Sequence, residues 1–311
     1  MTQRRRILWP VLGAVLFAAG CTPPVDWAAY ERFAVAEGLH RMERTPPDAP
    51  YSDRDLIRNF QHIAFGVEAM LEQEAREVPL RRWSGPVIYQ VEGQGVTQQD
   101  RIAIREFMAR METLSGIEVR EGRQGMNFLI FILDRRDRSE LTRMFGRLDG
   151  RGAEFLSDFI GQSDDAHPCR GTITTSEEAE IGFAAVLIKD ETVGRLRQTC
   201  IEEEISQSFG LTNDHPEVRP SLFNDDQEFA LLTDHDAALL QMLYHPILRP
   251  GMRREEAEPL LSDVLDDLRR QGKVVVPPAS AQRPAGSAPI NAAAPRAPVA
   301  PGNRSGTGNA G

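Results

Sequence analysis

The chain has 311 residues, of which 41% are hydrophobic and 26% are charged, and its formal net charge is −10. These values are typical of a globular protein with one sizeable core. The acidic balance, the absence of a basic stripe and an aromatic content of 7% argue against nucleic acid as a partner.

The first residues have the organisation of an export signal. Three arginines at 4–6 precede an apolar stretch at 7–19, which is too short for a comfortable membrane span. The sequence "AAGC" that ends at Cys21 resembles the lipobox of bacterial lipoproteins. This resemblance implies a lipid on Cys21 and a periplasm-facing place in the cell envelope. Thr22, where an aspartate would signal retention, favours the outer membrane over the inner. The alternative is an ordinary secretory signal with an incidental cysteine.

Two further cysteines, Cys169 and Cys200, remain after this signal. An even pair in an exported protein folds in an oxidising compartment. The sequence therefore predicts a disulfide between them, and two buried free thiols are the alternative.

A proline-rich segment follows the signal. Residues 22–50 contain five prolines, which predict a tether with one short helix near 27–40. From Ser52 onward, apolar residues recur at helical spacing and predict an amphipathic helix that ends before Pro79. At the other end, 276–311 is rich in Pro, Ala, Gly and Ser. It has too few large apolar side chains to fold, so we expect a disordered tail.

Strands and helices alternate between these segments. We predict strands at 86–93, 117–122, 127–134, 170–176 and 181–190, and helices at 97–116, 139–148, 195–209, 232–246 and 255–271. The stretch 127–134 is apolar on both faces, as a central strand is, whereas the threonine-rich 170–176 is typical of an edge strand. This order indicates an α/β (α+β) fold with a mixed, mostly parallel sheet and an antiparallel edge strand.

The stretch "CIEEEISQSFGLTND" at 200–214 has the spacing of a zinc-protease helix. On the pattern H-E-x-x-H-x-x-G-x-x-H, the three ligand positions fall on Glu203, Gln207 and Asn213. Glu204 takes the general-base position and Gly210 that of the glycine. Residues four apart share a helix face and can hold one metal, and the glutamate between them polarises the bound water. The glycine permits the left-handed turn that brings the third ligand back.

Two later segments extend a resemblance to metzincins. The sequence "SLFND" at 221–225 resembles the turn beneath their metal, although it has no methionine. The sequence "LTDHDAALLQMLY" at 232–244 resembles their C-terminal helix through Asp236, Leu243 and Tyr244. The likeness covers about residues 85–246 and implies a zincin-like domain in which 170–176 pairs with substrate.

A narrower resemblance places the chain with bacterial envelope lipoproteins whose domain has no assigned function. It is carried by the lipobox, by "LRRWSGPV" at 80–87, by "CIEEEISQSFGLTND" at 200–214, and by "LTDHDAALLQMLYHPILRPGM" at 232–252. The expected organisation is then a signal peptide (1–20), a lipid-anchored tether (21–50), an N-terminal helix packed on the domain (51–79), a zincin-like domain (80–250), a C-terminal helix (251–275) and the tail (276–311).

The zinc-protease pattern lacks all its histidines. Gln207 and Asn213 offer neutral amide oxygens, which are poor zinc ligands, although Asp214 or His215 could replace Asn213. An oxygen set suits Ca²⁺ or Mg²⁺ better than zinc. We therefore expect no metal and no cofactor. We interpret Glu203, Gln207 and Asn213 as a polar cleft face whose members hydrogen-bond to one another, and 202–204 as a mostly solvated acidic run. His62 is expected to be a packed or solvated residue, and the histidines at 167, 215, 235 and 245 are expected at surface or turn positions.

Three functions remain open. The first is a non-catalytic, pseudo-metalloprotease module that holds an extended peptide or an envelope partner against the edge strand. The second is a metal-dependent hydrolase with Glu204 as general base and non-histidine ligands. The third is a purely structural envelope lipoprotein. The degenerate pattern favours the non-enzymatic interpretation.

Overall fold

The computed structural model describes residues 25–66, 77–162 and 167–274. The predicted signal, Cys21 and the predicted tail lie outside the described residues, as do residues 67–76 of the predicted first amphipathic helix. None of the helices within the described ranges combines the length and the hydropathy that a membrane crossing requires.

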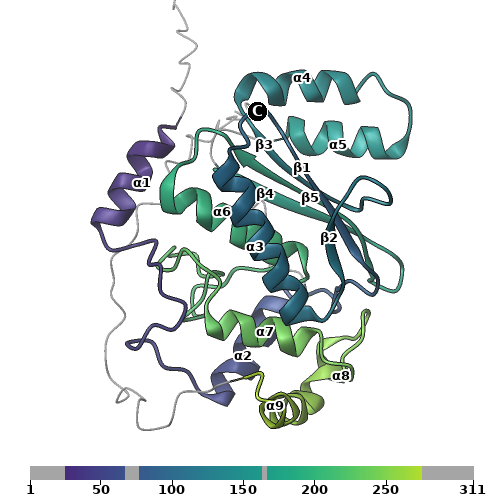
Figure 1. The fold of residues 1–311 in the computed structure, drawn as a ribbon. Helices are drawn as coiled ribbons and strands as arrows, with labels where there is room; N and C mark the ends of the chain where they lie inside the picture. The colour runs from purple at the N-terminus through teal and green to yellow at the C-terminus, as the bar shows by residue number, and fades with distance from the viewer. Residues whose placement is uncertain (1–24, 67–76, 163–166, 275–311) are drawn as a thin grey trace, which may run out of the picture.

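The described chain forms a mixed α/β domain around one sheet (Figure 1). Five strands, β1 (Val87–Glu92), β2 (Val119–Glu121), β3 (Phe128–Leu133), β4 (Cys169–Thr175) and β5 (Ile181–Lys189), lie in the order β2-β1-β3-β5-β4. Along this order, β2, β1, β3 and β5 pair in parallel with one another, and β4 pairs antiparallel with β5 at the edge. The predicted mostly parallel sheet with an antiparallel edge strand is confirmed.

Helices cover the two faces of the sheet unequally. The main core lies on the face covered by α3 (Gln98–Ser115) and α6 (Gly194–Ser208), and it extends to α2 (Asp53–Ala64), α7 (Asp234–Leu243) and α9 (Leu261–Arg270). A smaller core lies under the hairpin of α4 (Arg135–Phe145) and α5 (Arg151–Gly161). Strand β3 contributes side chains to both cores, which explains why its sequence is apolar throughout.

Local sequence signals begin three of the helices. Ser52, Thr97 and Thr233 each accept a hydrogen bond from the backbone at the third helical position. The aspartate there bonds back to the cap, which completes a capping box.

Other helix boundaries differ from prediction. α2 ends at Ala64, well before Pro79, and the backbone N–H of Val78 donates to the carbonyl of Phe65 at 2.9 Å. α4 begins at Arg135, four residues earlier than predicted, because Asp134 caps it. α5 was not predicted. The C-terminal helix is divided into α8 (Arg254–Ala257), a 3-10 turn with Pro259 (Glu258–Leu260) and α9.

The segment expected to be a tether packs on the domain in its described part. It forms α1 (Trp27–Ala36), in which Trp27 is buried. Further along, the segment pairs with a distant loop through a bridge between Arg41 and Phe229.

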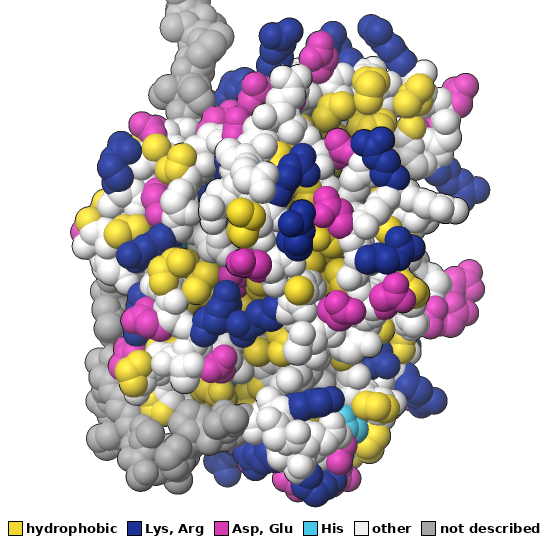
Figure 2. Space-filling view, viewed as in Figure 1, with side chains coloured by type: hydrophobic (Ala, Val, Ile, Leu, Met, Phe, Trp, Pro, Cys, Tyr) yellow, Lys and Arg dark blue, Asp and Glu magenta, His cyan; other side chains and the backbone are white. Residues whose placement is uncertain are grey.

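Charged side chains of both signs are interspersed over the face of the molecule drawn in Figure 2.

Candidate functional site

Helix α6 carries the zinc-protease pattern, and its beginning is fixed by α1. The Glu31 carboxylate accepts hydrogen bonds from the backbone N–H groups of Arg195 and Leu196, at 2.7 and 3.0 Å. A carboxylate at a helix N-terminus accepts hydrogen bonds from backbone N–H groups that have no partner within the helix. Its negative charge also interacts favourably with the positive end of the helix dipole. His40 Nδ1 lies 2.8 Å from the same carboxylate, and both residues are buried. The N-terminal segment is therefore part of the structure that positions α6.

The acidic run 202–204 is not mostly solvated, so this prediction was wrong. Glu202 is 1% exposed, and both of its carboxylate oxygens accept from the Arg44 guanidinium at 2.8 Å. The backbone N–H of Leu232 donates to it as well, at 2.8 Å. A buried carboxylate needs such a set of partners. Because Arg44 lies 158 residues away, no local pattern around Glu202 indicates this burial.

Glu204 lies beneath the edge strand. Its side chain packs against β4: a Cβ placed on Gly171 would lie 2.8 Å from Glu204 Oε2. Glu204 is 6% exposed, and Ser208, one turn later, is 1% exposed with a hydroxyl that has no hydrogen-bond partner among the described residues. The disulfide between Cys169 of β4 and Cys200 of α6 is present, so the predicted crosslink is confirmed. It joins the edge strand directly to the helix that lies below it.

The predicted ligand positions point to different neighbours. Gln207 Nε2 donates to Asp214 Oδ1 at 3.0 Å, so these two residues do meet. Asn213, in contrast, donates from Nδ2 to the carbonyl of His62 at 3.0 Å and is held by α2. Glu203 faces α1. Burial is the main cause that raises the pKa of Tyr30 in α1, and the negative charges of Glu31 and then Glu203 raise it further. The expectation that Glu203, Gln207 and Asn213 form one hydrogen-bonded set was wrong for Asn213.

The turn after α6 has the conformation that the sequence predicted. Gly210 has a φ of +111°, and a Cβ there would lie 2.1 Å from the carbonyl oxygen of Arg81. The segment resembling the metzincin turn is buried and tied to α7. Asp236 accepts from Ser221 Oγ at 2.6 Å and from the backbone N–H of Leu222 at 2.8 Å. Tyr244 donates to the carbonyl of Phe209 at 3.0 Å, which satisfies an acceptor at the end of α6.

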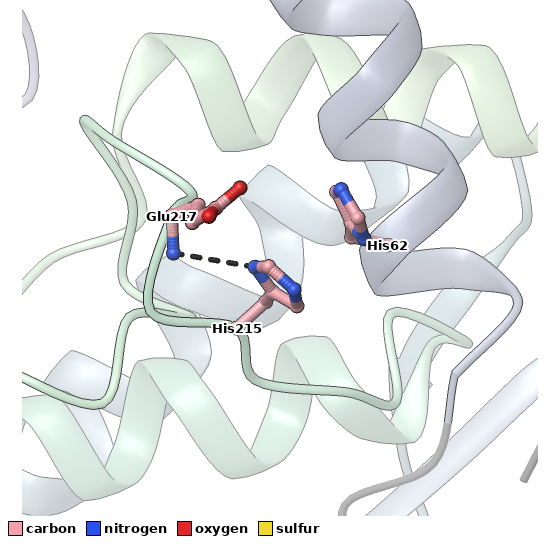
Figure 3. A group of neighbouring side chains, drawn as sticks. All are labelled: His62, His215 and Glu217. Carbon is pink, nitrogen blue, oxygen red and sulfur yellow. Dashed lines mark hydrogen bonds between the residues drawn. The ribbon is translucent and has the colours of Figure 1, made fainter. Parts of the chain in front are cut away.

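A group of potential ligands lies outside the helix pattern. His62, in the last turn of α2, stacks on His215 with ring centroids 4.0 Å apart, and Glu217 lies beside them (Figure 3). The ligand atoms of these three residues all lie within 4.8 Å of one another. Burial, and then the charges of His215 and Arg254, lower the pKa of His62, although Glu217 opposes the shift.

Sequence reasoning missed this group because 153 residues separate its two histidines; the one local signal was the proximity of His215 to the third ligand position. Two other histidines also differ from the expected surface or turn positions. His235 and His245 are buried, beside Asp236 and Asp267 respectively.

Comparison with known proteins gives a family. A family model described as "Protein of unknown function (DUF2927)" matches residues 53–263. The chain belongs to this family. A search of curated proteins found no significant match. The description of DUF2927 names no activity.

The DUF2927 match begins with α2 and ends within α9, so it contains the whole sheet, α6 and the turn after it. Glu31 and Arg44, which hold α6 from the N-terminal segment, lie before the matched residues. Within the described residues, the cluster that could hold a metal consists of His62, His215 and Glu217 and includes none of the predicted ligand positions on α6.

Proposed function

We propose that this DUF2927 protein is an exported lipoprotein, anchored through Cys21, that binds an extended peptide or a segment of an envelope partner without cleaving it. The single observation that carries the binding proposal is the edge strand β4. Among the described residues, no strand pairs with its outer side, while α6 closes the space beneath it. Exposed edges are sites where another chain can add a strand.

The register of β4 shows which backbone groups are available. The N–H of Lys189 donates to the carbonyl of Pro168 at 3.0 Å, which fixes this pair as a hydrogen-bonded one. Such pairs alternate along an antiparallel ladder, so Thr172 bonds to β5 whereas Gly171 and Ile173 turn their N–H and C=O groups outward. These outward groups can form a ladder with an incoming peptide.

The surroundings of this edge suit capture more than catalysis. The side chain of Ile173 packs into the main core, and the disulfide holds the start of β4 on α6, so the edge is preformed. A preformed edge reduces the ordering cost of binding. Gly171 leaves room for the Glu204 carboxylate directly under the strand. Helix α6 contains no histidine, and Gln207 donates to Asp214 instead.

Residue-resolved hydrogen exchange tests the proposal. A peptide selected from a random-peptide library by binding to the purified chain should slow the exchange of the Gly171 and Ile173 amides. The Thr172 amide, which already bonds to β5, serves as the internal control and should change little. If selected peptides leave Gly171 and Ile173 unprotected, the β4 proposal fails.

Photo-crosslinking in cells tests for a natural partner. A photoreactive amino acid at the exposed Thr174 of β4 should give an adduct with a second envelope protein, whereas the same group at the exposed Arg270 of α9 should not. Equal adducts at the two positions would reject β4 as the binding surface. Loss of fatty-acid labelling on Cys21→Ser tests the anchor separately.

The hydrolase hypothesis has its own outcome in the same samples. Cleavage of a selected peptide that is abolished by Glu204→Gln would replace the binding module with an enzyme. If no peptide is selected and no adduct forms at Thr174, the structural-lipoprotein hypothesis remains.

A further inference from the structure

The strongest unassigned feature of the molecule is a group of three potential metal ligands where the end of α2 meets the loop that follows α6. His62 comes from α2, and His215 and Glu217 come from the loop (Figure 3). His62 and His215 are half-buried and Glu217 is exposed, so solvent reaches the group. None of the three residues occupies a position of the zinc-protease pattern or lies on the β4 edge, although the sequence offers His215 as a replacement for Asn213.

The backbone that carries these side chains is held on both sides. Asn213 Nδ2 donates to the carbonyl of His62 at 3.0 Å, and Thr212 Oγ1 donates to the carbonyl of Gly66 at 3.0 Å. The backbone N–H of His215 donates to the carbonyl of Phe223 at 3.0 Å. The loop is therefore fixed against α2 by hydrogen bonds that do not involve the potential ligand atoms. A site whose supports are already made needs only side-chain rotation to bind an ion.

The donor types select a class of ion. Two imidazoles and one carboxylate are ligands that Zn²⁺ and related transition metals prefer, whereas Ca²⁺ and Mg²⁺ take oxygen ligands almost throughout. Three protein ligands leave a fourth tetrahedral position, which water can occupy from the solvent side. From these residues and their placement, we propose that His62, His215 and Glu217 bind a divalent transition metal ion of the zinc class.

The geometry requires a small closure. Metal–ligand bonds of about 2.1 Å place tetrahedral ligand atoms about 3.4 Å apart. The ligand atoms now lie within 4.8 Å of one another, so some side chains must move inward by about 1 Å. The two stacked rings rotate apart to direct one nitrogen each at the ion. Because the three side chains are at least partly exposed, rotation about their χ angles achieves this without moving the core.

Metal binding exchanges one hydrogen bond at His215. Its Nδ1 now accepts from the backbone N–H of Glu217 at 3.2 Å. Either Nδ1 gives up this hydrogen bond and binds the ion with the same lone pair, or the ring proton moves from Nε2 to Nδ1 and Nε2 binds the ion. In both cases the bound ion crosslinks α2 to the loop that carries Asn213 and Asp214. This site goes beyond the proposed peptide binding and does not depend on it.

Titration of the chelator-treated full chain with Zn²⁺, and with Co²⁺ as a spectroscopic probe, tests the site. We expect one equivalent of Zn²⁺ by calorimetry and visible Co²⁺ absorption of the intensity that tetrahedral coordination gives. His62→Ala and His215→Ala should each weaken the affinity at least tenfold, and Glu217→Gln should weaken it less. His167→Ala, which removes an exposed histidine elsewhere, is the matched control and should bind as the unmodified chain does.

Circular dichroism establishes that each variant is folded. If His62→Ala disturbs α2, His215→Ala carries the test, because it changes a loop residue. Absence of stoichiometric binding, or equal binding by the two histidine variants and the control, would overturn the proposal. Either result leaves the β4 proposal untouched, because that proposal is read from amide exchange and crosslinking.

Discussion

The disulfide between Cys169 and Cys200 gives the most direct test of how the edge strand is held. It closes a loop of 31 residues and joins the start of β4 to the middle of α6. Breaking it releases conformational entropy in the unfolded chain. The chain-entropy relation gives about 12 cal/mol/K for this loop, or about 3.7 kcal/mol at 25 °C. We therefore expect reduction to lower the free energy of unfolding by about that amount.

Urea unfolding of the oxidised and reduced chain, followed by circular dichroism, measures the difference. Cys21→Ser in all samples leaves only the two thiols of interest. Reduction is the better perturbation because Cys200 is fully buried, so that Cys200→Ala would add a cavity to the effect of the lost crosslink. The double Ala variant should accordingly lose more stability than the reduced chain. A loss below about 1 kcal/mol on reduction would refute the argument from loop entropy.

Three further predictions concern stability. Arg44→Ala leaves the buried Glu202 carboxylate without its positive partner and should lower the free energy of unfolding in urea by about 2–3 kcal/mol. This is somewhat less than for a fully buried pair, because Arg44 is partly exposed. A loss under about 0.5 kcal/mol would contradict this prediction. Gly210→Ala places a Cβ against a backbone carbonyl and should cost about 3 kcal/mol or more, whereas Gly116→Ala, with a φ of +72° and no atom within 4 Å, should cost about 1 kcal/mol; equal losses would show that steric contact is not the cause. The hydrogen bond from Arg41 lowers the pKa of Asp48 to about 2, below its unfolded value, so this carboxylate stabilises the fold above about pH 4 and loses that effect as the pH falls through 2. The difference in free energy of unfolding between the unmodified chain and Asp48→Asn should therefore shrink between about pH 5 and pH 2. A constant difference would reject this prediction.

The fold was predictable where one local pattern decided the outcome. The capping boxes at Ser52, Thr97 and Thr233 encode helix starts in four residues each. The continuous apolar run of β3 encodes burial on both faces, because a strand at the sheet centre contacts helices on either side. The disulfide was predicted from the expected export of the chain and from the even pair of cysteines that remains beyond the predicted signal.

Prediction failed where tertiary contacts decided. α5 has a glycine at its N-cap, two more within it and no side-chain cap, so its intrinsic helix preference is weak. It forms a helix because Phe159 and Ile160 pack on the second face of the sheet. α2 stops early for a similar reason. The Asn213 side chain fills the place where a Cβ on Gly66 would lie, so a residue 147 positions away helps to determine how the chain leaves this helix.

The candidate sites divide in the same way. A helix pattern can show that residues four apart share a face, and Glu203 and Gln207 do so, but it cannot show what that face meets. In the structure the face meets α1 and Asp214, and the best metal-binding set comes instead from His62 and His215, which no spacing rule connects. The glutamate and the glycine of the pattern both have structural roles. Glu204 fills the space that Gly171 leaves under β4, and Gly210 lets the chain pass close to the backbone of Arg81. Both residues are therefore explained by close packing against a neighbouring segment, and a catalytic role for Glu204 would have to be established by cleavage.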